Sequence, residues 1–305
     1  MQPKVNKYLV VVAGPTGVGK TQVTLDLASR FGSVIVSADS RQIYREMAIG
    51  TARPTPVQRD QVPHYLIDYV SLSEEYSAGR YARECTQLLE QLFMHHDIVF
   101  LAGGSGLYIR AVIEGFDEMP AVPGEIREKW TRSFEERGLA FLQQELSLRD
   151  PGYTTKVDLQ NPRRLIRALS VMDASGTSFS ALRKKHPVEH PFEILKIFCN
   201  LPRKELYTRI HQRVDEMIVQ GLVEEVTSLL PYRHTQAMQS VGYREIIAYL
   251  DGASTLEEAI AKIKQHTCNY AKRQLTWFRH QGDWTEFNPP DVEVIDRFIR
   301  RKLEK

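Results

Sequence analysis

The sequence predicts an α/β fold: a parallel-sheet core with a helical insertion and C-terminal helices. Short, continuous apolar runs at residues 8–13, 34–38 and 97–102 are typical of strands that are buried on both faces. A glycine-rich turn follows the first and the third run, and helical periodicity separates the runs. Repeated strand, turn and helix is the pattern of a parallel sheet with crossover helices.

Two helices are expected between these strands. The first extends from the end of the first glycine turn to about Phe31. The second covers residues 78–93, where Cys85, Leu89 and Leu92 share one face.

A helical pattern replaces the strand pattern in the middle of the chain. Two prolines and a glycine within residues 118–124 indicate a hinge. The elements predicted after it are three helices and a strand, at residues 125–137, 139–148, 162–174 and 194–201. The predicted domains are an α/β core, a helical insertion and a helical tail, at residues 1–117 with 194–290, 118–193 and 291–305.

Beyond the insertion, apolar residues at four-residue steps predict one continuous helix. These residues are Leu206, Ile210, Val214, Ile218 and Leu222. A second long helix, rich in Lys and Arg, is predicted over residues 257–278.

The composition indicates an ordinary soluble protein of about two domains. Of the 305 residues, 42% are apolar and 26% are charged, which excludes wholesale disorder. No run of about 18 apolar residues occurs, so we expect no membrane span. Three widely separated cysteines and the lack of a signal-peptide pattern favour a cytoplasmic protein with reduced thiols.

Positive charge is concentrated in two later segments. Residues 160–186 hold six Lys or Arg against one acid, and residues 262–280 hold five against none. Such segments are typical of proteins that bind a polyanion, although solvated helix faces have the same composition. Charge alone leaves both interpretations open.

A phosphate-binding motif lies directly after the first predicted strand. The pattern G-x-x-x-x-G-K-[ST] stands between a strand and a helix, where backbone N–H groups and a helix N-terminus surround a phosphate chain. Lys20 supplies a mobile cation, and the Thr21 hydroxyl is a candidate Mg²⁺ ligand. The motif predicts a P-loop that binds a di- or triphosphate, such as ATP, without identifying the compound. Its residues are Gly14, Pro15, Thr16, Gly17, Val18, Gly19, Lys20 and Thr21.

Two further residues follow the ends of predicted strands. Asp39 comes after the second strand, and Ser105 lies in the glycine turn after the third. Because the carboxyl ends of parallel strands meet at one edge, we expect Asp39 to share a cleft with the phosphate loop. Its carboxylate is a candidate Mg²⁺ partner through water or a candidate general base, with a helix N-cap as the alternative.

At this point the motifs closely resemble those of the tRNA dimethylallyltransferases, also called tRNA isopentenyltransferases. The resemblance extends to about residue 285, and the chain does not show the C-terminal Cys₂His₂ finger of many eukaryotic members, which favours a bacterial-type enzyme. The matching blocks are Gly14–Thr21, Ser37–Tyr44, Ile49–Pro54, Pro63–Asp68, Gly103–Tyr108, Asn161–Leu169, Arg203–Arg213, Gln239–Arg244 and Ala271–Arg279.

The resemblance implies a specific reaction. The dimethylallyl group of dimethylallyl diphosphate would pass to the exocyclic N6 amine of the adenosine just 3′ of a tRNA anticodon, releasing diphosphate. The phosphate loop and Mg²⁺ would hold the diphosphate. Asp39 matches the family's general base on the amine, and Ser105 matches a position that is usually threonine. Arg209 lies in an R-x-x-L-x-x-R-I block and is a candidate for neutralising the diphosphate, while Arg127 matches an arginine near the reactive site.

The resemblance also implies contacts to the tRNA anticodon stem-loop by a protein that we expect to be a monomer. Three segments match tRNA-contacting positions of the family. Their residues are Asp39, Ser40, Arg41 and Gln42, then Arg163, Arg164, Leu165, Ile166 and Arg167, and finally Ser240, Val241, Gly242, Tyr243 and Arg244.

Three other functions share part of this sequence pattern. A small-molecule kinase would use the same loop for ATP but has no need of two basic segments without acids. A non-catalytic RNA-binding protein with a relic loop would not need Lys20, Thr21 and Asp39 intact. A related enzyme that prenylates free adenine nucleotides would share the first half of the pattern, whereas the arginines of residues 163–167 favour tRNA.

Overall fold

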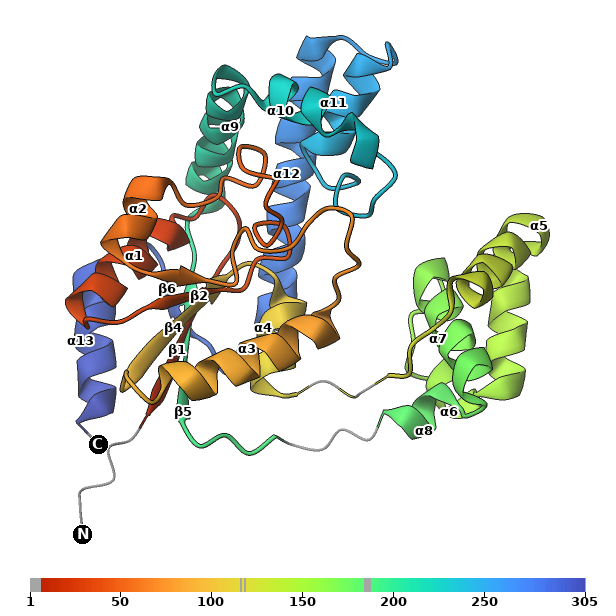
Figure 1. The fold of residues 1–305 in the computed structure, drawn as a ribbon, viewed down its shortest axis with the longest axis horizontal. Coiled ribbons are helices and arrows are strands. Elements are labelled where there is room, and N and C mark those ends of the chain that lie inside the picture. Colours follow the sequence, from red (N-terminus) through yellow and green to blue (C-terminus); the bar gives the residue numbers. More distant parts are fainter. Residues whose placement is uncertain (1–6, 116, 118, 184–187, 305) are drawn as a thin grey trace. The chain divides into compact units, whose positions relative to one another are not determined.

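The computed structural model describes residues 7–115, 117, 119–183 and 188–304. The chain divides into two compact units, one formed by residues 1–113 with 189–305 and the other by residues 114–188 (Figure 1). The first unit is an α/β domain and the second is helical, so the predicted fold class is confirmed. The helical unit starts and ends a few residues before the predicted range of 118–193.

The α/β unit is built on a six-stranded sheet in the order β3-β2-β4-β1-β5-β6, and its neighbouring strands pair in parallel. The strands are β1 (Tyr8–Ala13), β2 (Ile35–Ser37), β3 (His64–Tyr65), β4 (Ile98–Gly103), β5 (Glu193–Cys199) and β6 (Thr285–Phe287). The sequence pattern did not predict β3 and β6, because strands of two and three residues are too short to show a periodicity.

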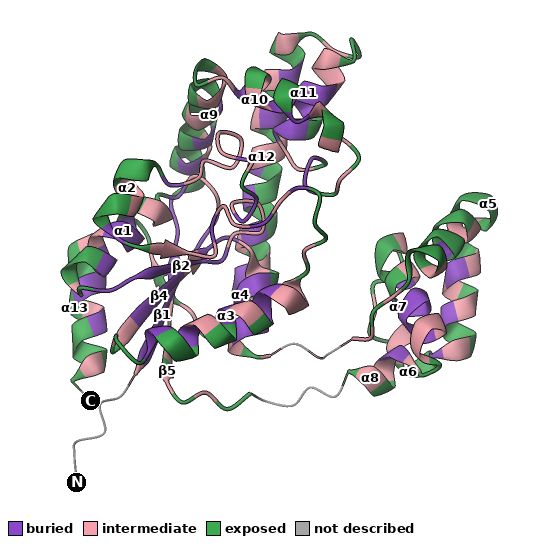
Figure 2. Ribbon diagram, in the orientation of Figure 1, coloured by how far each residue is buried: buried purple, intermediate pink, exposed green. Residues whose placement is uncertain are grey.

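The α/β unit contains ten helices among the described residues, and some of them cover the two faces of the sheet. The ten helices are α1 (Lys20–Arg30), α2 (Pro56–Gln61), α3 (Ala78–Leu92), α4 (Gly106–Ile113), α9 (Arg203–Val219), α10 (Leu222–Ser228), the 3₁₀ helix η1 (Leu230–Tyr232), α11 (Tyr243–Leu250), α12 (Leu256–Arg279) and α13 (Val292–Leu303). Val10 and Val12 of β1 join the core cluster of α1 and α13, whereas Leu9 and Val11 join that of α3 and α4. The strands are therefore buried on both faces (Figure 2), as their apolar runs predict.

The predicted helix through Leu222 is wrong. Gly221 adopts a φ of 99°, which ends α9 and places Leu222 at the start of α10. A left-handed backbone of this kind costs glycine little, whereas a four-residue apolar step carries no information about it. By contrast, the predicted break between the helices of residues 125–137 and 139–148 is confirmed, because Gly138 has a non-helical φ of 75°.

The helical unit has a core of its own. Its helices are α5 (Gly124–Arg149), α6 (Pro151–Thr154), α7 (Pro162–Ser175) and α8 (Phe179–Leu182). Trp130, Leu142, Leu146, Leu165 and Leu169 pack together between α5 and α7. At its edge, the Asp173 carboxylate accepts hydrogen bonds from Lys129 at 2.9 Å, Trp130 Nε1 at 2.9 Å and Arg149 at 2.6 Å.

Two expectations from composition can be compared with the structure. Cys85, Cys199 and Cys268 are buried and free, and burial raises the pKa of the Cys85 and Cys199 thiols to about 12. These thiols are therefore protonated and inert at neutral pH. No helix of the described residues is long and apolar enough to cross a membrane.

We expect Asp173→Asn to destabilise the helical unit by about 1–3 kcal/mol, because two cations and an indole N–H lose their anionic acceptor. Burial opposes ionisation of Asp173, but the hydrogen bonds from Lys129, Arg149 and Trp130 outweigh it and hold the pKa of the carboxyl below its ordinary value. This stabilisation is therefore present above the ordinary pKa of about 4 and is lost as the pH falls through the lowered one. Urea unfolding at pH 7 and at lower pH measures it. Glu135→Gln, at an exposed position of α5, is the control, and equal unfolding free energies for both variants would contradict the prediction.

Candidate active site

The candidate site lies where the carboxyl ends of three parallel strands meet. Ala13 at the end of β1 pairs with Gly103 at the end of β4, and Ser37 at the end of β2 pairs with Ala102. This register brings the phosphate loop, Asp39 and the glycine turn to one edge of the sheet. A cavity of about 440 Å³ at this edge is lined by residues from all three segments, including Thr16, Lys20, Thr21, Asp39, Gly103 and Gly104.

The phosphate loop has the backbone that its glycines predict. Gly17 and Gly19 have φ values of 82° and 94°, in the left-handed region that favours glycine. Gly19 is the N-cap of α1, so Lys20 opens that helix. The Lys20 ammonium donates to the Pro15 carbonyl at 2.7 Å, while the Val18 side chain is fully buried in the core. The loop is thus rigid at its base and presents N–H groups and one cation to the cavity.

Lys20 is electrostatically sensitive. Burial, the largest cause, and the neighbouring Arg213 together lower the pKa of its ammonium to about 8, although the nearby Asp39 carboxylate opposes the shift. An anion bound against Lys20 would stabilise the charged form. A bound phosphate would therefore give Lys20 an anionic partner. Because the ammonium is partly desolvated, that ion pair would be stronger than one in water.

Two arginines of α9 lie beside the loop, one turn apart. Arg209, which the sequence analysis selected, pairs with Glu205 at 2.8 Å and lines a second cavity of about 370 Å³. Lys20 and Thr21 line both cavities. Arg213, which that analysis did not select, also lines both and donates to the Thr16 hydroxyl at 3.4 Å. Its four-residue spacing from Arg209 was the available signal.

Asp39 begins a turn rather than a helix. Its Oδ1 accepts from the backbone N–H groups of Arg41 at 2.9 Å and Gln42 at 3.4 Å, and residues 40–43 form the turn. The N–H of Ser40 donates to the Ser105 hydroxyl at 2.9 Å, and that hydroxyl donates to Ser40 Oγ at 3.2 Å. Ser105 therefore ties the glycine turn of β4 to the segment that carries Asp39.

The loop of residues 48–54 forms another wall of the site. Gln42 donates through its side chain to the carbonyl of Thr51 at 3.1 Å and of Ala52 at 3.2 Å, so its amide holds this loop. The carboxylate of Glu225 on α10 accepts from the backbone N–H groups of residues 48–50 at 2.7–3.0 Å and from the Tyr243 hydroxyl at 2.6 Å. Sequence reasoning missed Glu225, because a partner of backbone N–H groups leaves no motif.

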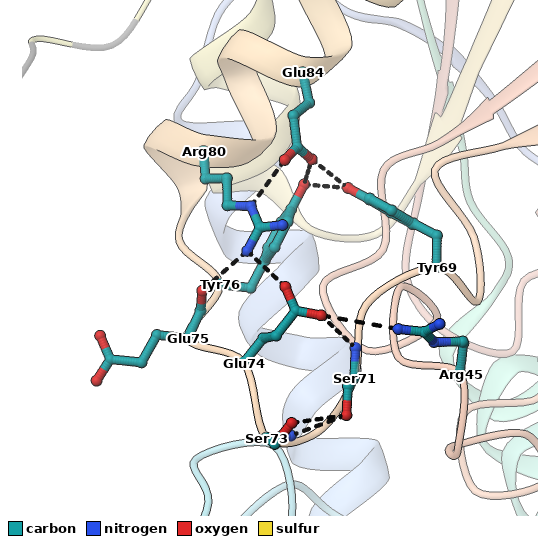
Figure 3. A network of polar contacts seen from close by, with 9 residues as sticks. All are labelled: Arg45, Tyr69, Ser71, Ser73, Glu74, Glu75, Tyr76, Arg80 and Glu84. Atoms are coloured by element: carbon teal, nitrogen blue, oxygen red, sulfur yellow. Dashed lines mark hydrogen bonds and ion pairs between the residues drawn. The ribbon is translucent and has the colours of Figure 1, made fainter.

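A polar network around Glu84 and Arg80 (Figure 3) lies next in the chain to this site and is connected to the segment after Asp39 by one backbone hydrogen bond. The Glu84 carboxylate accepts from the hydroxyls of Tyr69 at 2.7 Å and Tyr76 at 2.6 Å, and from Arg80 Nε at 2.8 Å. Burial opposes ionisation of Glu84, yet these donors hold its pKa below the ordinary value. The backbone N–H of Tyr69 donates to the Ile43 carbonyl at 2.9 Å, which connects the network to the turn that follows Asp39.

The segment of residues 240–244 reaches the same cavity from the start of α11. Tyr243 is buried, and its ring lies against Gly50, where a Cβ would come within 2.5 Å of it. Arg244 donates to Glu245 at 2.5 Å and is 44% exposed on its side chain. Of these residues, Arg244 thus offers a charged surface, while Tyr243 supports the loop of residues 48–54.

The remaining predicted residues lie in the helical unit. Arg163, Arg164 and Arg167 are exposed along α7, while Leu165 is fully buried in the core of that unit and Ile166 is half-buried. The side chain of Leu165 therefore stabilises the helix rather than offering a contact surface. Arg127 lies on α5. Lys184 and Lys185 of the basic segment fall outside the described residues.

The oxygen atoms of the site suit a magnesium ion that is coordinated mainly by water and by the oxygens of a bound phosphate compound. No cluster of three or more His, Cys, Asp or Glu residues that could hold a metal occurs in the described residues. Mg²⁺ in phosphate sites keeps several waters and takes only one or two protein oxygens, the rest coming from phosphate. The Thr21 hydroxyl, on the wall of both cavities, and the Asp39 carboxylate in the larger one meet that requirement.

The chain is similar to a known family and to named proteins over nearly its whole length. The family model described as IPP transferase matches residues 42–281. A tRNA dimethylallyltransferase of Cytophaga hutchinsonii is 43% identical over 301 residues, 99% of each chain. The tRNA dimethylallyltransferase 1 of Bacteroides thetaiotaomicron is 46% identical over 292 residues, covering 96% of this chain and 95% of that one.

Solved structures agree with these relatives. The full-length tRNA isopentenylpyrophosphate transferase of Bacillus halodurans has a TM-score of 0.73 at 37% identity, covering 98% of this chain and 97% of that one. A eukaryotic dimethylallyltransferase acting on tRNA has a TM-score of 0.81 at 25% identity, covering 97% of this chain and 77% of that one. The family model begins after the phosphate loop and spans the helical unit, and the alignment with the Cytophaga hutchinsonii relative, over 301 residues, covers the loop as well. Sequence, fold and site geometry together therefore show that the chain belongs to the IPP transferase family.

Proposed function

We propose that the protein transfers the dimethylallyl group from dimethylallyl diphosphate to the N6 amine of the adenosine just 3′ of a tRNA anticodon. The observation that carries the proposal is that Lys20, Thr21 and Asp39 line the same cavity. The donor substrate has a diphosphate as its leaving group, and Lys20 and Thr21 suit that group. The acceptor amine must lose a proton, and the Asp39 carboxylate can accept it. The named relatives support the same reaction.

The donor half of the site would bind the diphosphate. Lys20, Arg213 and the N-terminus of α1 place positive charge where negative charge develops on the departing diphosphate. Arg209 lines the adjoining cavity next to the same loop and would add to this neutralisation. Magnesium held by Thr21 and phosphate oxygens would supply further charge neutralisation.

The acceptor half would receive a purine taken out of its stack. An enzyme that alkylates a base amine in RNA has to expose that amine, so the base enters a cavity. Asp39 lies on the wall of this cavity, with Oδ1 held by backbone N–H groups. The carboxylate would accept the amine proton as the new C–N bond forms, and the C–O bond to diphosphate breaks with its electron pair leaving on oxygen.

Basic side chains would hold the surrounding RNA. Arg273 of α12 and Arg41 line the cavity, and Lys272 is exposed next to Arg273. The exposed arginines of α7 would contact phosphates of the anticodon stem-loop, positioning the tRNA without reading its sequence. We propose that the protein acts as a monomer in the cytoplasm, where its RNA substrate is found.

Purified protein with Mg²⁺, labelled dimethylallyl diphosphate and unmodified tRNA should produce labelled tRNA. The label should map to the adenosine 3′ of the anticodon and should depend on both substrates. Nuclease digestion followed by nucleoside chromatography measures this. Labelling of free adenine nucleotides instead of tRNA, or phosphoryl transfer from ATP without prenyl transfer, would contradict the proposal.

Asp39→Asn should lower the single-turnover transfer rate by about 10²–10⁴-fold, since the amide cannot take a proton. Binding of tRNA and of dimethylallyl diphosphate should stay within a few-fold of wild type, because the shape is kept. Rapid-quench kinetics and separate binding titrations measure these quantities. Asp60→Asn, an exposed residue of α2, is the control, and a wild-type rate in Asp39→Asn would remove Asp39 as the base.

Replacing Arg163, Arg164 and Arg167 with Ala should weaken tRNA binding while leaving donor binding unchanged. The slope of log K against log salt concentration should become shallower by about one for each phosphate that these side chains neutralise in the wild-type protein. Filter binding over a range of salt concentrations measures the slope. A control removes the same charge from α13, by replacing Arg297, Arg301 and Lys302 with Ala. An equal effect of both triple variants would show that only net charge matters.

A further inference from the structure

We propose that Gln274 is a positioning residue that sets the distance between the diphosphate loop and the catalytic carboxylate. This inference rests on the proposed transfer reaction and assigns a role to a buried amide on α12. Gln274 is 7% exposed and lies on the wall of the larger cavity. Gln274 belongs to the α12 block that matches the family, but the proposed reaction assigns it no role.

The Gln274 amide connects two segments that come from different strands. Its Oε1 accepts from the backbone N–H of Thr16 in the phosphate loop at 2.9 Å. Its Nε2 donates to the carbonyl of Gly104, in the turn after β4, at 2.9 Å. One side chain thus spans the loop after β1 and the turn after β4 on the cavity side, beyond the last backbone pairing at Ala13 and Gly103.

The turn after β4 is shaped to receive α12. A Cβ at Gly104 would lie 2.4 Å from Gln274 Nε2, and a Cβ at Gly106 would lie 2.4 Å from the ring of Trp277. Gln274 and Trp277 are three residues apart and share one face of the helix. Glycines at these two positions therefore let the helix approach the turn closely, which is the condition for the hydrogen bond from Gln274 to the Gly104 carbonyl.

The same turn is fastened to the segment of Asp39. A Cβ at Gly103 would lie 2.1 Å from the Ala38 carbonyl, and the Ser105 N–H donates to that carbonyl at 3.2 Å. The Ser105 hydroxyl accepts from Ser40 N–H. A continuous series of hydrogen bonds therefore connects the Thr16 backbone, through Gln274 and the glycine turn, to the residues on both sides of Asp39.

Glutamine meets a requirement here that few side chains meet. The bridge needs an acceptor for one backbone N–H and a donor for one backbone carbonyl at the same distance from the helix. Glutamate offers no donor at neutral pH, methionine offers neither group in usable strength, and asparagine is shorter by one C–C bond of about 1.5 Å. The bridge therefore depends on the primary amide at this length.

The test compares binding with chemistry in Gln274→Met, which keeps the length and apolar volume of the side chain but removes both hydrogen bonds. We expect affinities for dimethylallyl diphosphate and for tRNA, each titrated alone, to stay within about threefold of wild type. The single-turnover transfer rate should fall about 10- to 100-fold, as expected when two reacting groups lose their relative placement. The matched control is Gln265→Met, an exposed glutamine on the same helix, which should transfer at the wild-type rate.

Gln274→Asn provides a second variant in case the methionine variant does not fold. It keeps an uncharged amide that is too short to reach both the Thr16 N–H and the Gly104 carbonyl, so transfer should again slow while tRNA binding stays close to wild type. A wild-type transfer rate in either folded variant would overturn the proposal. Loss of both substrate affinities in parallel with the rate would also overturn it, because that is the result of a merely structural role. Failure of the proposed function itself would appear differently, as absence of transfer by the wild-type protein.

Discussion

The parallel register between β1 and β4 is the constraint on which the site depends. Because Ala13 pairs with Gly103, the phosphate loop and the glycine turn leave the sheet at the same level, with the Asp39 segment next to them after β2. Parallel strands have all their carboxyl ends at one edge of the sheet. Residues that are far apart in the chain therefore converge there, and this does not require the helices that follow the strands to contact one another. A shift of register by one residue would reverse the faces of β1 and would separate these segments.

The charged side chains at this edge of the sheet suit an anionic ligand. Lys20 and Arg213 are half-buried near one carboxylate, and desolvation lowers the pKa of both cations. Desolvated cations interact strongly with an incoming phosphate, since little water remains to be displaced and the local dielectric constant is low. In the proposed reaction, the Asp39 carboxylate takes its proton from the other substrate. One cavity thus carries groups that suit a diphosphate and groups that suit a proton-losing amine.

Many interactions around the site act on backbone groups rather than on side chains. Glu225 holds three consecutive N–H groups of the loop at residues 48–50, Gln42 holds two carbonyls of the same loop, and Gln274 holds one group in each of two segments. Loops that form a cavity have few backbone partners within regular structure, so polar side chains that are half-buried or buried satisfy them instead. This explains why polar residues distant from the reacting atoms still belong to the architecture of the site.

The sequence by itself determined the local chemistry: the apolar strands, the phosphate loop with Lys20 and Thr21, Asp39 at a strand end, and the helical insertion. Each of these is encoded in neighbouring residues, through periodicity, glycine spacing or a motif, and so is readable without coordinates. Only the tertiary structure decided that Gly221 divides a helix, that Arg213 lines the cavity with Lys20, and that Gln274 joins two strand ends. For Arg213 and Gln274, the physical reason is that their roles depend on which segments meet in space, and a partner far along the chain leaves no local pattern. For Gly221, the apolar spacing of a helix carries no information about the backbone φ of the glycine.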